Sequence, residues 1–178
     1  MPKTACWHQP LCLAPHHLHP WLCDPGSLTA RLKARFPQFR VQVLLQGWQP
    51  AHQDEYIPLQ LTRQHLHVAT REVLLLSGNT PLVFAHSITL RKTLRGGFQL
   101  LGRIGSRPLG ESLFANPTIR RSPLSWRCVD ARHPLWRKAQ VAVGPLPRRL
   151  WARRSVFQTG NDRLLVTELF LPAIDASP

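Results

Sequence analysis

Short runs of alternating apolar and polar residues fill most of the chain after residue 25, and a period of two is typical of β-strands. Turns that contain glycine separate two pairs of these runs, which indicates antiparallel hairpins. The candidate strands cover 40–49, 65–76, 82–90, 119–129, 137–143, 151–157 and 164–172, with a polar loop at 51–61 and a short helix at 98–104. With about six strands among these seven candidate runs, mostly joined by hairpins, the pattern predicts an α+β fold: an antiparallel sheet with helices on one side.

A further helix is predicted from its capping residue and its apolar spacing. Ser27 can accept a hydrogen bond at the helix N-terminus. Leu28, Leu32 and Phe36 then follow at intervals of four, on a helix whose other faces are basic. One apolar stripe suits a helical lid over a cavity, and an ordinary surface helix has the same pattern. The sequence leaves both interpretations open.

Glu168 is the only charged residue in the run 164–172, where both faces of the expected strand are apolar. A strand that is apolar on both faces is usually covered on both, so Glu168 is predicted to be buried. A buried carboxylate costs on the order of several kcal/mol unless a cation or strong hydrogen-bond donors meet it. A structural ion pair with a nearby arginine would satisfy it, and so would a ligand in a functional site.

Arg71 is a second charge within an otherwise apolar strand. Its neighbour Glu72 points to the opposite face, because successive side chains alternate across a strand, so the two cannot serve one interior site. If Arg71 and Glu168 both point inward, they form a polarised site for a small molecule that carries a carboxylate at one end and a hydroxyl at the other. Spacing alone does not establish that they converge.

The chain is strongly basic, with 23 Lys and Arg residues against nine Asp and Glu and a formal charge of +14. Such a surface suits an anionic partner: nucleic acid, an anionic membrane or a charged small molecule. The basic residues are dispersed, and the chain has no zinc finger, basic-aromatic stacking motif or dense basic helix, which disfavours nucleic acid. The long apolar stretch 73–90 is interrupted by a turn at 77–81, which disfavours insertion into a membrane.

Residues 1–24 are rich in proline and histidine and are predicted to form a loosely ordered leader before a single domain at 25–178. The four cysteines form no C-x-x-C pair and follow no secretory signal, so we expect free thiols and a cytoplasmic protein. Cysteines and histidines of the leader could hold zinc, but their spacing matches no familiar site. Nothing in the pattern suggests an apolar interface helix, so a monomer is expected.

Four segments, in this order, resemble the chorismate pyruvate-lyase (4-hydroxybenzoate synthase) family. They are Arg71-Glu72-Val73-Leu74-Leu75, the stretch 102–114 (GRIGSRPLGESLF), Leu150-Trp151-Ala152-Arg153-Arg154-Ser155, and the stretch 165–173 (LVTELFLPA). The resemblance covers about residues 25–174. It implies a six-stranded antiparallel sheet with helical flaps over an internal ligand cavity.

The resemblance also implies a reaction: chorismate is split into 4-hydroxybenzoate and pyruvate, without metal or organic cofactor, on the way to ubiquinone. Arg71 would bind the ring carboxylate of the ligand, and Glu168 would meet its ring hydroxyl. Main-chain groups at Leu28 and Leu109 would complete the site. A second function class shares this fold: the effector-sensing domains of some transcription regulators bind small acids without turning them over, but they stand beside a helix-turn-helix segment, for which 178 residues leave no room.

His86 marks a departure from the family, whose members commonly carry an arginine on this strand. If His86 faces the ligand, it forms a second anion contact that depends on its protonation, and affinity should fall as the pH rises past about 6.5. The alternative is a histidine that is merely hydrogen-bonded on a face of the sheet.

Overall fold

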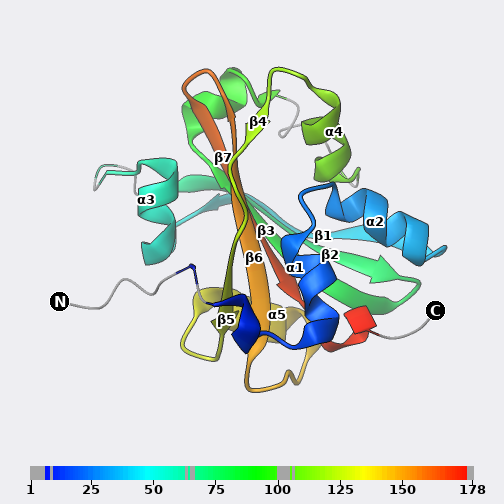
Figure 1. The fold of residues 1–178 in the computed structure, drawn as a ribbon. Helices are drawn as coiled ribbons and strands as arrows, with labels where there is room; N and C mark the ends of the chain where they lie inside the picture. Colours follow the sequence, from blue (N-terminus) through cyan, green and yellow to red (C-terminus); the bar gives the residue numbers. More distant parts are fainter. Residues whose placement is uncertain are drawn as a thin grey trace.

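The computed structural model of the protein describes residues 7–175 except 9, 63, 65, 66, 100–104 and 106 (Figure 1). Its strands are β1 (Phe39–Gln49), β2 (Val68–Ser77), β3 (Thr80–Thr89), β4 (Arg120–Arg121), β5 (Ser125–Val129), β6 (Leu150–Thr159) and β7 (Asp162–Phe170). Its α-helices are α1 (His19–Cys23), α2 (Leu28–Arg35), α3 (Tyr56–Leu59), α4 (Leu109–Ala115) and α5 (Pro134–Val143). Short 3₁₀ turns are η1 (Leu11–Leu13), η2 (His16–Leu18), η3 (Gln53–Glu55), η4 (Arg91–Arg95) and η6 (Pro172–Asp175).

The seven strands form one antiparallel sheet in the order β1-β2-β3-β7-β6-β4, and β5 also pairs with β6. Both predicted hairpins are present. Gly78 turns β2 into β3 with a φ of 56°, and Gly160 turns β6 into β7 with a φ of 53°, a left-handed conformation that glycine adopts at little cost. The predicted fold class is therefore confirmed, with one strand more than expected.

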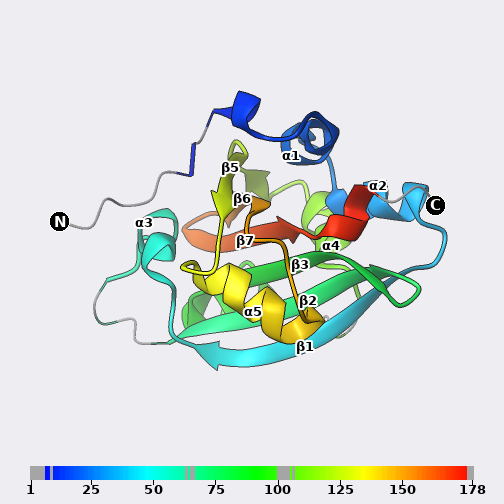
Figure 2. The same ribbon diagram turned by 90° about the horizontal axis from the view of Figure 1, so that it is seen from below.

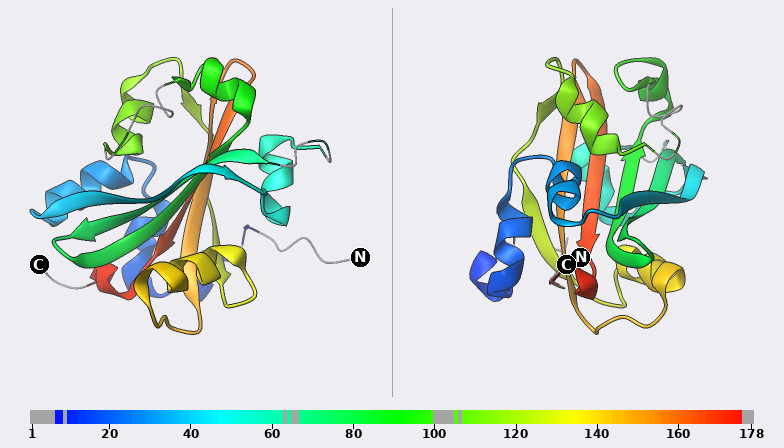
Figure 3. Two further views of the ribbon diagram at one scale, coloured as in Figure 1. Left: turned by 180° about the vertical axis from the view of Figure 1, so that it is seen from behind. Right: turned by 90° about the vertical axis from the view of Figure 1, so that its right-hand side faces the viewer.

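Helices cover both faces of the sheet, where one covered side was expected (Figures 2 and 3). On one face, α1 and α2 pack against side chains of β2 and β3, and α4 packs against β6 and β7. On the other face, α5 packs against β2, β3 and β7, while α3 covers Ile88 and Leu165. The fully apolar central strands explain this arrangement, because each of their faces needs a cover.

Two predicted elements were wrong and one was incomplete. Residues 137–143 belong to helix α5 rather than to a strand: the His133 side chain accepts a hydrogen bond from the Leu135 N–H, and Pro134 occupies the first turn. The candidate strand 119–129 is divided into β4 and β5, and the loop 51–61 contains η3 and α3. Most of the helix expected at 98–104 lies outside the described residues.

The described part of the leader differs from the loosely ordered segment that was expected. Leu18, Trp21 and Leu22 follow a helical spacing and are buried in the same core cluster as Leu28 and Leu32. Three short helical turns, η1, η2 and α1, carry this apolar face. The high content of proline and histidine concealed it in the sequence. The assignment of 25–178 as one separate domain remains a prediction.

The helix predicted after Ser27 is confirmed as α2. The Ser27 hydroxyl accepts a hydrogen bond from the Ala30 N–H at 3.3 Å, and Leu28, Leu32 and Phe36 are all buried. No helix within the described ranges is long and apolar enough to cross a membrane.

Candidate functional site

A cavity of about 40 Å³ lies between the sheet and the pair of helices α2 and α4. Its walls come from α2, α4 and the inward face of strands β1, β2, β3, β6 and β7, with Arg121 from β4. The lining residues are Leu28, Thr29, Val41, Arg71, Val73, Leu75, Ala85, Ser87, Pro108, Leu109, Gly110, Leu113, Phe114, Arg121, Phe157, Val166 and Glu168. All four residues that the family resemblance singled out, Leu28, Arg71, Leu109 and Glu168, therefore meet at one cavity.

Arg71 is buried at one end of this cavity, with 6% of its surface exposed. One terminal nitrogen donates to the main-chain oxygens of Gly105 at 3.0 Å and Arg107 at 3.2 Å, while the buried Nε has no hydrogen-bond partner among the described residues. Burial lowers the pKa of Arg71, yet a guanidinium stays charged at neutral pH. An unsatisfied buried donor costs about 1–3 kcal/mol, so this arginine is prepared for an acceptor that enters the cavity.

Glu168 lies on the same face of the sheet as Arg71, two strands away. Arg71 is aligned across β3 with Val166 of β7, and Glu168 is two residues further along β7. Its side chain is 13% exposed, so it is less buried than the sequence predicted, because it borders the cavity. The fully buried Arg153 is its cross-strand neighbour and donates from Nε to Glu168 Oε2 at 2.6 Å. The arginine pair that was one of two alternatives is thus present. Glu168 Oε1 has no such bond within the described part of the chain and remains free to accept one.

Arg153 was not recognised from the sequence as part of this site. One of its terminal nitrogens donates to the main-chain oxygens of Trp21 at 2.6 Å and Asp24 at 3.0 Å. Arg153 therefore ties α1 and the approach to α2 to the carboxylate that faces the cavity.

Leu28 and Leu109 are each the first residue of a helix, α2 and α4 respectively. The first N–H groups of a helix have no intrahelical acceptor. Both leucine side chains are buried at the cavity wall, so their main-chain N–H groups are suited to a ligand contact.

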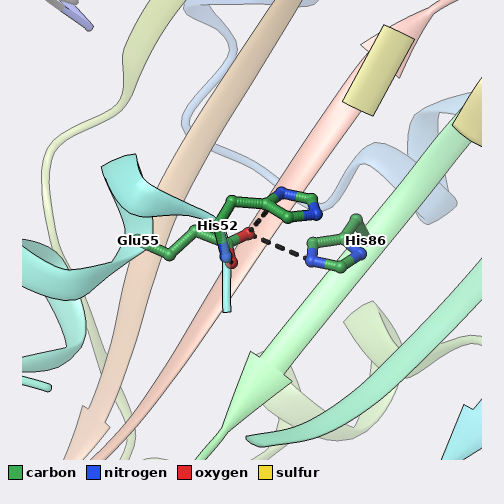
Figure 4. A group of neighbouring side chains, drawn as sticks. All are labelled: His52, Glu55 and His86. Carbon is green, nitrogen blue, oxygen red and sulfur yellow. Dashed lines mark hydrogen bonds and ion pairs between the residues drawn. The ribbon is translucent and has the colours of Figure 1, made fainter. Parts of the chain in front are cut away.

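His86 lies on the opposite face of the sheet from Arg71 and does not border the cavity. Its Nε2 is 3.0 Å from Glu55 Oε1 (Figure 4). Its Nδ1 is 3.0 Å from Glu72 Oε1, so the ring is held between two carboxylates. Lys138 from α5 also contacts Glu72. The possibility that His86 contacts the ligand is therefore wrong, because the alternation of the strand directs it away. The hydrogen-bonded histidine on a sheet face is the correct alternative.

His52, Glu55 and His86 are the residues of the described chain whose donor atoms come close enough to share a metal ion. The rings of His52 and His86, however, are stacked at 4.9 Å with an angle of 10° between their planes. A metal bound by two imidazoles lies in the plane of each ring, so this geometry fits an ion-pair network better than a shared ion. Within the described part of the leader, the cysteine and histidine side chains form no group that could share a metal ion. Cys6 lies outside the described residues.

This network predicts a bell-shaped dependence of stability on pH. Burial would raise the pKa of Glu55, but hydrogen bonds from His52 and His86 lower it from 4.5 to about 2. Burial would lower the pKa of His86, but its bonds to Glu55 and Glu72 raise it above 6.5. The contribution of Glu55 is lost as the pH falls from 4.5 towards 2, and that of His86 as the pH rises beyond 6.5 through its folded-state pKa.

The free energy of unfolding in urea, measured from pH 3 to 9, should therefore be highest between about pH 4.5 and 6.5. The His86→Asn variant should lose much of the decline on the alkaline side. Its decline on the acid side should become smaller but persist, because His52 still interacts with Glu55. An identical alkaline decline in both proteins would show that His86 is not its source.

The fold and the polarised cavity are those of an α+β domain suited to a small-molecule ligand. Two solved structures share this fold: the C-terminal domain of PhnF (17% identity, TM-score 0.58, covering 84% of this chain and 92% of that one) and the effector domain of PhnF from Mycobacterium smegmatis (13% identity, TM-score 0.53, covering 83% and 89%). At such low identity the likeness concerns the fold alone.

The family model described as chorismate lyase matches residues 1–176, and the chain belongs to this family. Among similar curated proteins are the "Probable chorismate pyruvate-lyase" of Aromatoleum aromaticum, 46% identical over 97% of this chain and 95% of the relative, and that of Thiobacillus denitrificans, 47% identical over 90% and 86%. A protein of the same name in Nitrosomonas europaea is 43% identical over 94% of both chains. Membership of this family supports a lyase that binds a small molecule.

Proposed function

We propose that the protein is a chorismate pyruvate-lyase, which converts chorismate into 4-hydroxybenzoate and pyruvate for the biosynthesis of ubiquinone. The observation that carries the proposal is the meeting of Arg71, Glu168, Leu28 and Leu109 at one closed cavity. Membership of the chorismate lyase family supports the same conclusion. We also propose that the enzyme acts as a monomer in the cytoplasm and needs no metal or organic cofactor.

In this proposal Arg71 binds the ring carboxylate, because a guanidinium presents paired donors in a plane that matches a carboxylate. Glu168 accepts a hydrogen bond from the ring hydroxyl through Oε1, while Arg153 holds Oε2. The two side chains start from strands roughly 10 Å apart. A six-membered ring between them requires the cavity to widen beyond its volume of about 40 Å³. The main-chain N–H groups of Leu28 and Leu109 complete the site.

The reaction needs orientation more than it needs an external reagent. The C–O bond to the enolpyruvyl group breaks, the ring carbon that carries the hydroxyl loses its proton, and the electrons of that C–H bond complete the aromatic ring. The departing enolpyruvate takes up a proton and becomes pyruvate, so no electrons are gained or lost overall. A closed cavity that fixes the conformation of the substrate and excludes water can supply much of the acceleration.

The test is an assay of the purified protein with chorismate in the presence of a metal chelator. We expect 4-hydroxybenzoate and pyruvate in a ratio of one to one. The competing function, a non-catalytic sensor of small acids, has support from the shared fold of the effector domains. Tight binding of 4-hydroxybenzoate without turnover of chorismate would favour that sensor.

Product release should require α2 and α4 to separate, because the cavity that they cover is small. An exposed ion pair between Lys33 of α2 and Glu111 of α4 links the two helices. Exposed pairs contribute at most about 1 kcal/mol, so Glu111→Lys should speed the dissociation of 4-hydroxybenzoate by a factor of up to about 5 in stopped-flow fluorescence. The charge swap Lys33→Glu with Glu111→Lys is the matched control and should restore the slower rate. Equal rates in all three proteins would exclude this contact from the gating of the cavity.

A further inference from the structure

Two arginines at the cavity lack a carboxylate partner. All nine acidic side chains of the protein lie within the described residues. Eight of them form ion pairs with described arginine, lysine or histidine side chains other than Arg71 and Arg121. The ninth, Asp162, accepts hydrogen bonds from the Thr93 hydroxyl and the Gly97 N–H. Glu168, the carboxylate that borders the cavity, is already paired with Arg153.

Within the described residues, the hydrogen bonds of Arg121 all go to neutral groups. Its Nε donates to the Ser155 hydroxyl at 2.8 Å, and one terminal nitrogen donates to the main-chain oxygens of Pro25 at 2.8 Å and Gly26 at 3.2 Å. The guanidinium also lies over two aromatic rings, 5.4 Å from the centre of Phe114 and 5.3 Å from that of Phe157. These contacts fix the orientation of the charge at the cavity wall without neutralising it.

The cavity therefore carries two positive charges, those of Arg71 and Arg121, that form no ion pair among the described residues. Burial lowers the pKa of Arg121 even though the nearby Glu168 acts in the opposite direction. A guanidinium cannot shed its proton at neutral pH, so a partly buried one favours the binding of an anion. The Glu168–Arg153 pair adds no net charge, and the cavity as a whole is suited to a dianion.

The register of the sheet separates the two arginines in the way that such a ligand requires. Arg71 pairs with Ser87, Ser87 with Val166, and Val166 with Ser155, whose hydroxyl binds Arg121. Arg71 and Arg121 are thus associated with opposite ends of one row across four strands, roughly 14 Å long at the usual strand spacing. Glu168 lies in the next row, on the strand that separates β3 from β6.

We propose that Arg121 binds the second carboxylate of the substrate, that of the enolpyruvyl group, and so selects the dianionic substrate over singly charged ring acids. This inference rests on the proposed function. In chorismate the enolpyruvyl ether is on the ring carbon next to the one that carries the hydroxyl, in the meta position to the ring carboxylate, and its own carboxylate extends away from the ring. A ligand with its ring carboxylate on Arg71 and its hydroxyl on Glu168 therefore directs the enolpyruvyl group towards the end of the cavity where Arg121 lies. After cleavage, pyruvate carries this carboxylate away and 4-hydroxybenzoate keeps only the contact with Arg71.

The test compares substrate with product in the Arg121→Gln variant. We expect kcat/KM for chorismate to fall roughly 30-fold or more, as for the loss of a desolvated charge partner, while the Kd of 4-hydroxybenzoate changes less than about threefold. Arg120→Gln is the matched control, because it removes the same charge from an exposed position on the same strand and should leave both quantities unchanged. Equal losses of substrate and product affinity would reduce Arg121 to a structural role, and an unchanged kcat/KM would exclude the contact.

A second measurement uses the unmodified protein and so does not depend on the folding of a variant. The ligand 3-(carboxymethoxy)-4-hydroxybenzoate carries an additional carboxylate next to the hydroxyl, and it should bind at least about tenfold more tightly than its side-chain methyl ester. Equal affinities would overturn the inference. If the unmodified protein produced no 4-hydroxybenzoate from chorismate, the proposed function would fail, whereas normal turnover with equal affinities would remove only the role of Arg121.

Discussion

Replacing Arg71 with alanine should lower kcat/KM for chorismate by roughly two to four orders of magnitude and weaken the binding of 4-hydroxybenzoate to a similar extent. The reason is that the ring carboxylate would be buried without a partner, because Arg121, the other described arginine that borders the cavity, is associated with the opposite end of the row across the sheet. Stability should change little, because Arg71 donates only to the main-chain oxygens of Gly105 and Arg107 among the described residues and leaves a buried donor unsatisfied.

Steady-state kinetics and equilibrium titration with 4-hydroxybenzoate measure these effects. Arg71→Lys is the matched control: it keeps the charge but loses the paired geometry, so its activity should fall between those of the alanine variant and the unmodified protein. A folded Arg71→Ala protein with nearly normal activity would contradict the assignment of the site.

The second large effect is expected for stability. Arg153→Met should reduce the free energy of unfolding by about 3–5 kcal/mol, because it leaves the Glu168 carboxylate and the main-chain oxygens of Trp21 and Asp24 without their partner. Urea denaturation measures the loss. The double variant Arg153→Met with Glu168→Leu should recover part of the lost free energy of unfolding, since no charge is then left unpaired. The double variant should have no lyase activity, because it lacks Glu168. A loss below about 1 kcal/mol in the single variant would show that the pair is not a main support of this region.

Helices and hairpins that are determined by neighbouring residues, such as a capping residue or a glycine turn, were predictable from the sequence. The helix α2 was recognised from Ser27 and its apolar stripe, and the β6–β7 hairpin from the turn at Gly160. The register of that hairpin also identifies the partner of Glu168. A two-residue turn that pairs Thr159 with Asp162 also places Arg153 opposite Glu168, so the partner of the carboxylate could have been derived from the register alone.

Other features depend on tertiary contacts that no local pattern records. The run 137–143 alternates like a strand but forms α5, because Leu135, Trp136 and Ala139 are buried together on one helical face. The alternation of side chains separated Arg71 from Glu72 correctly, and the same rule, applied across the β2–β3 pairing, places His86 beside Glu72. The polar contacts of Arg121 reach Pro25 and Gly26, nearly one hundred residues earlier, and no spacing argument could have found them.

The most direct test of the central claim is a crystal structure of the protein with 4-hydroxybenzoate bound. We expect the ligand to lie between α2, α4 and the sheet, with its carboxylate paired to Arg71, its hydroxyl hydrogen-bonded to Glu168, and main-chain contacts from Leu28 and Leu109. A ligand bound in the reverse orientation, or bound outside this cavity, would contradict this expectation.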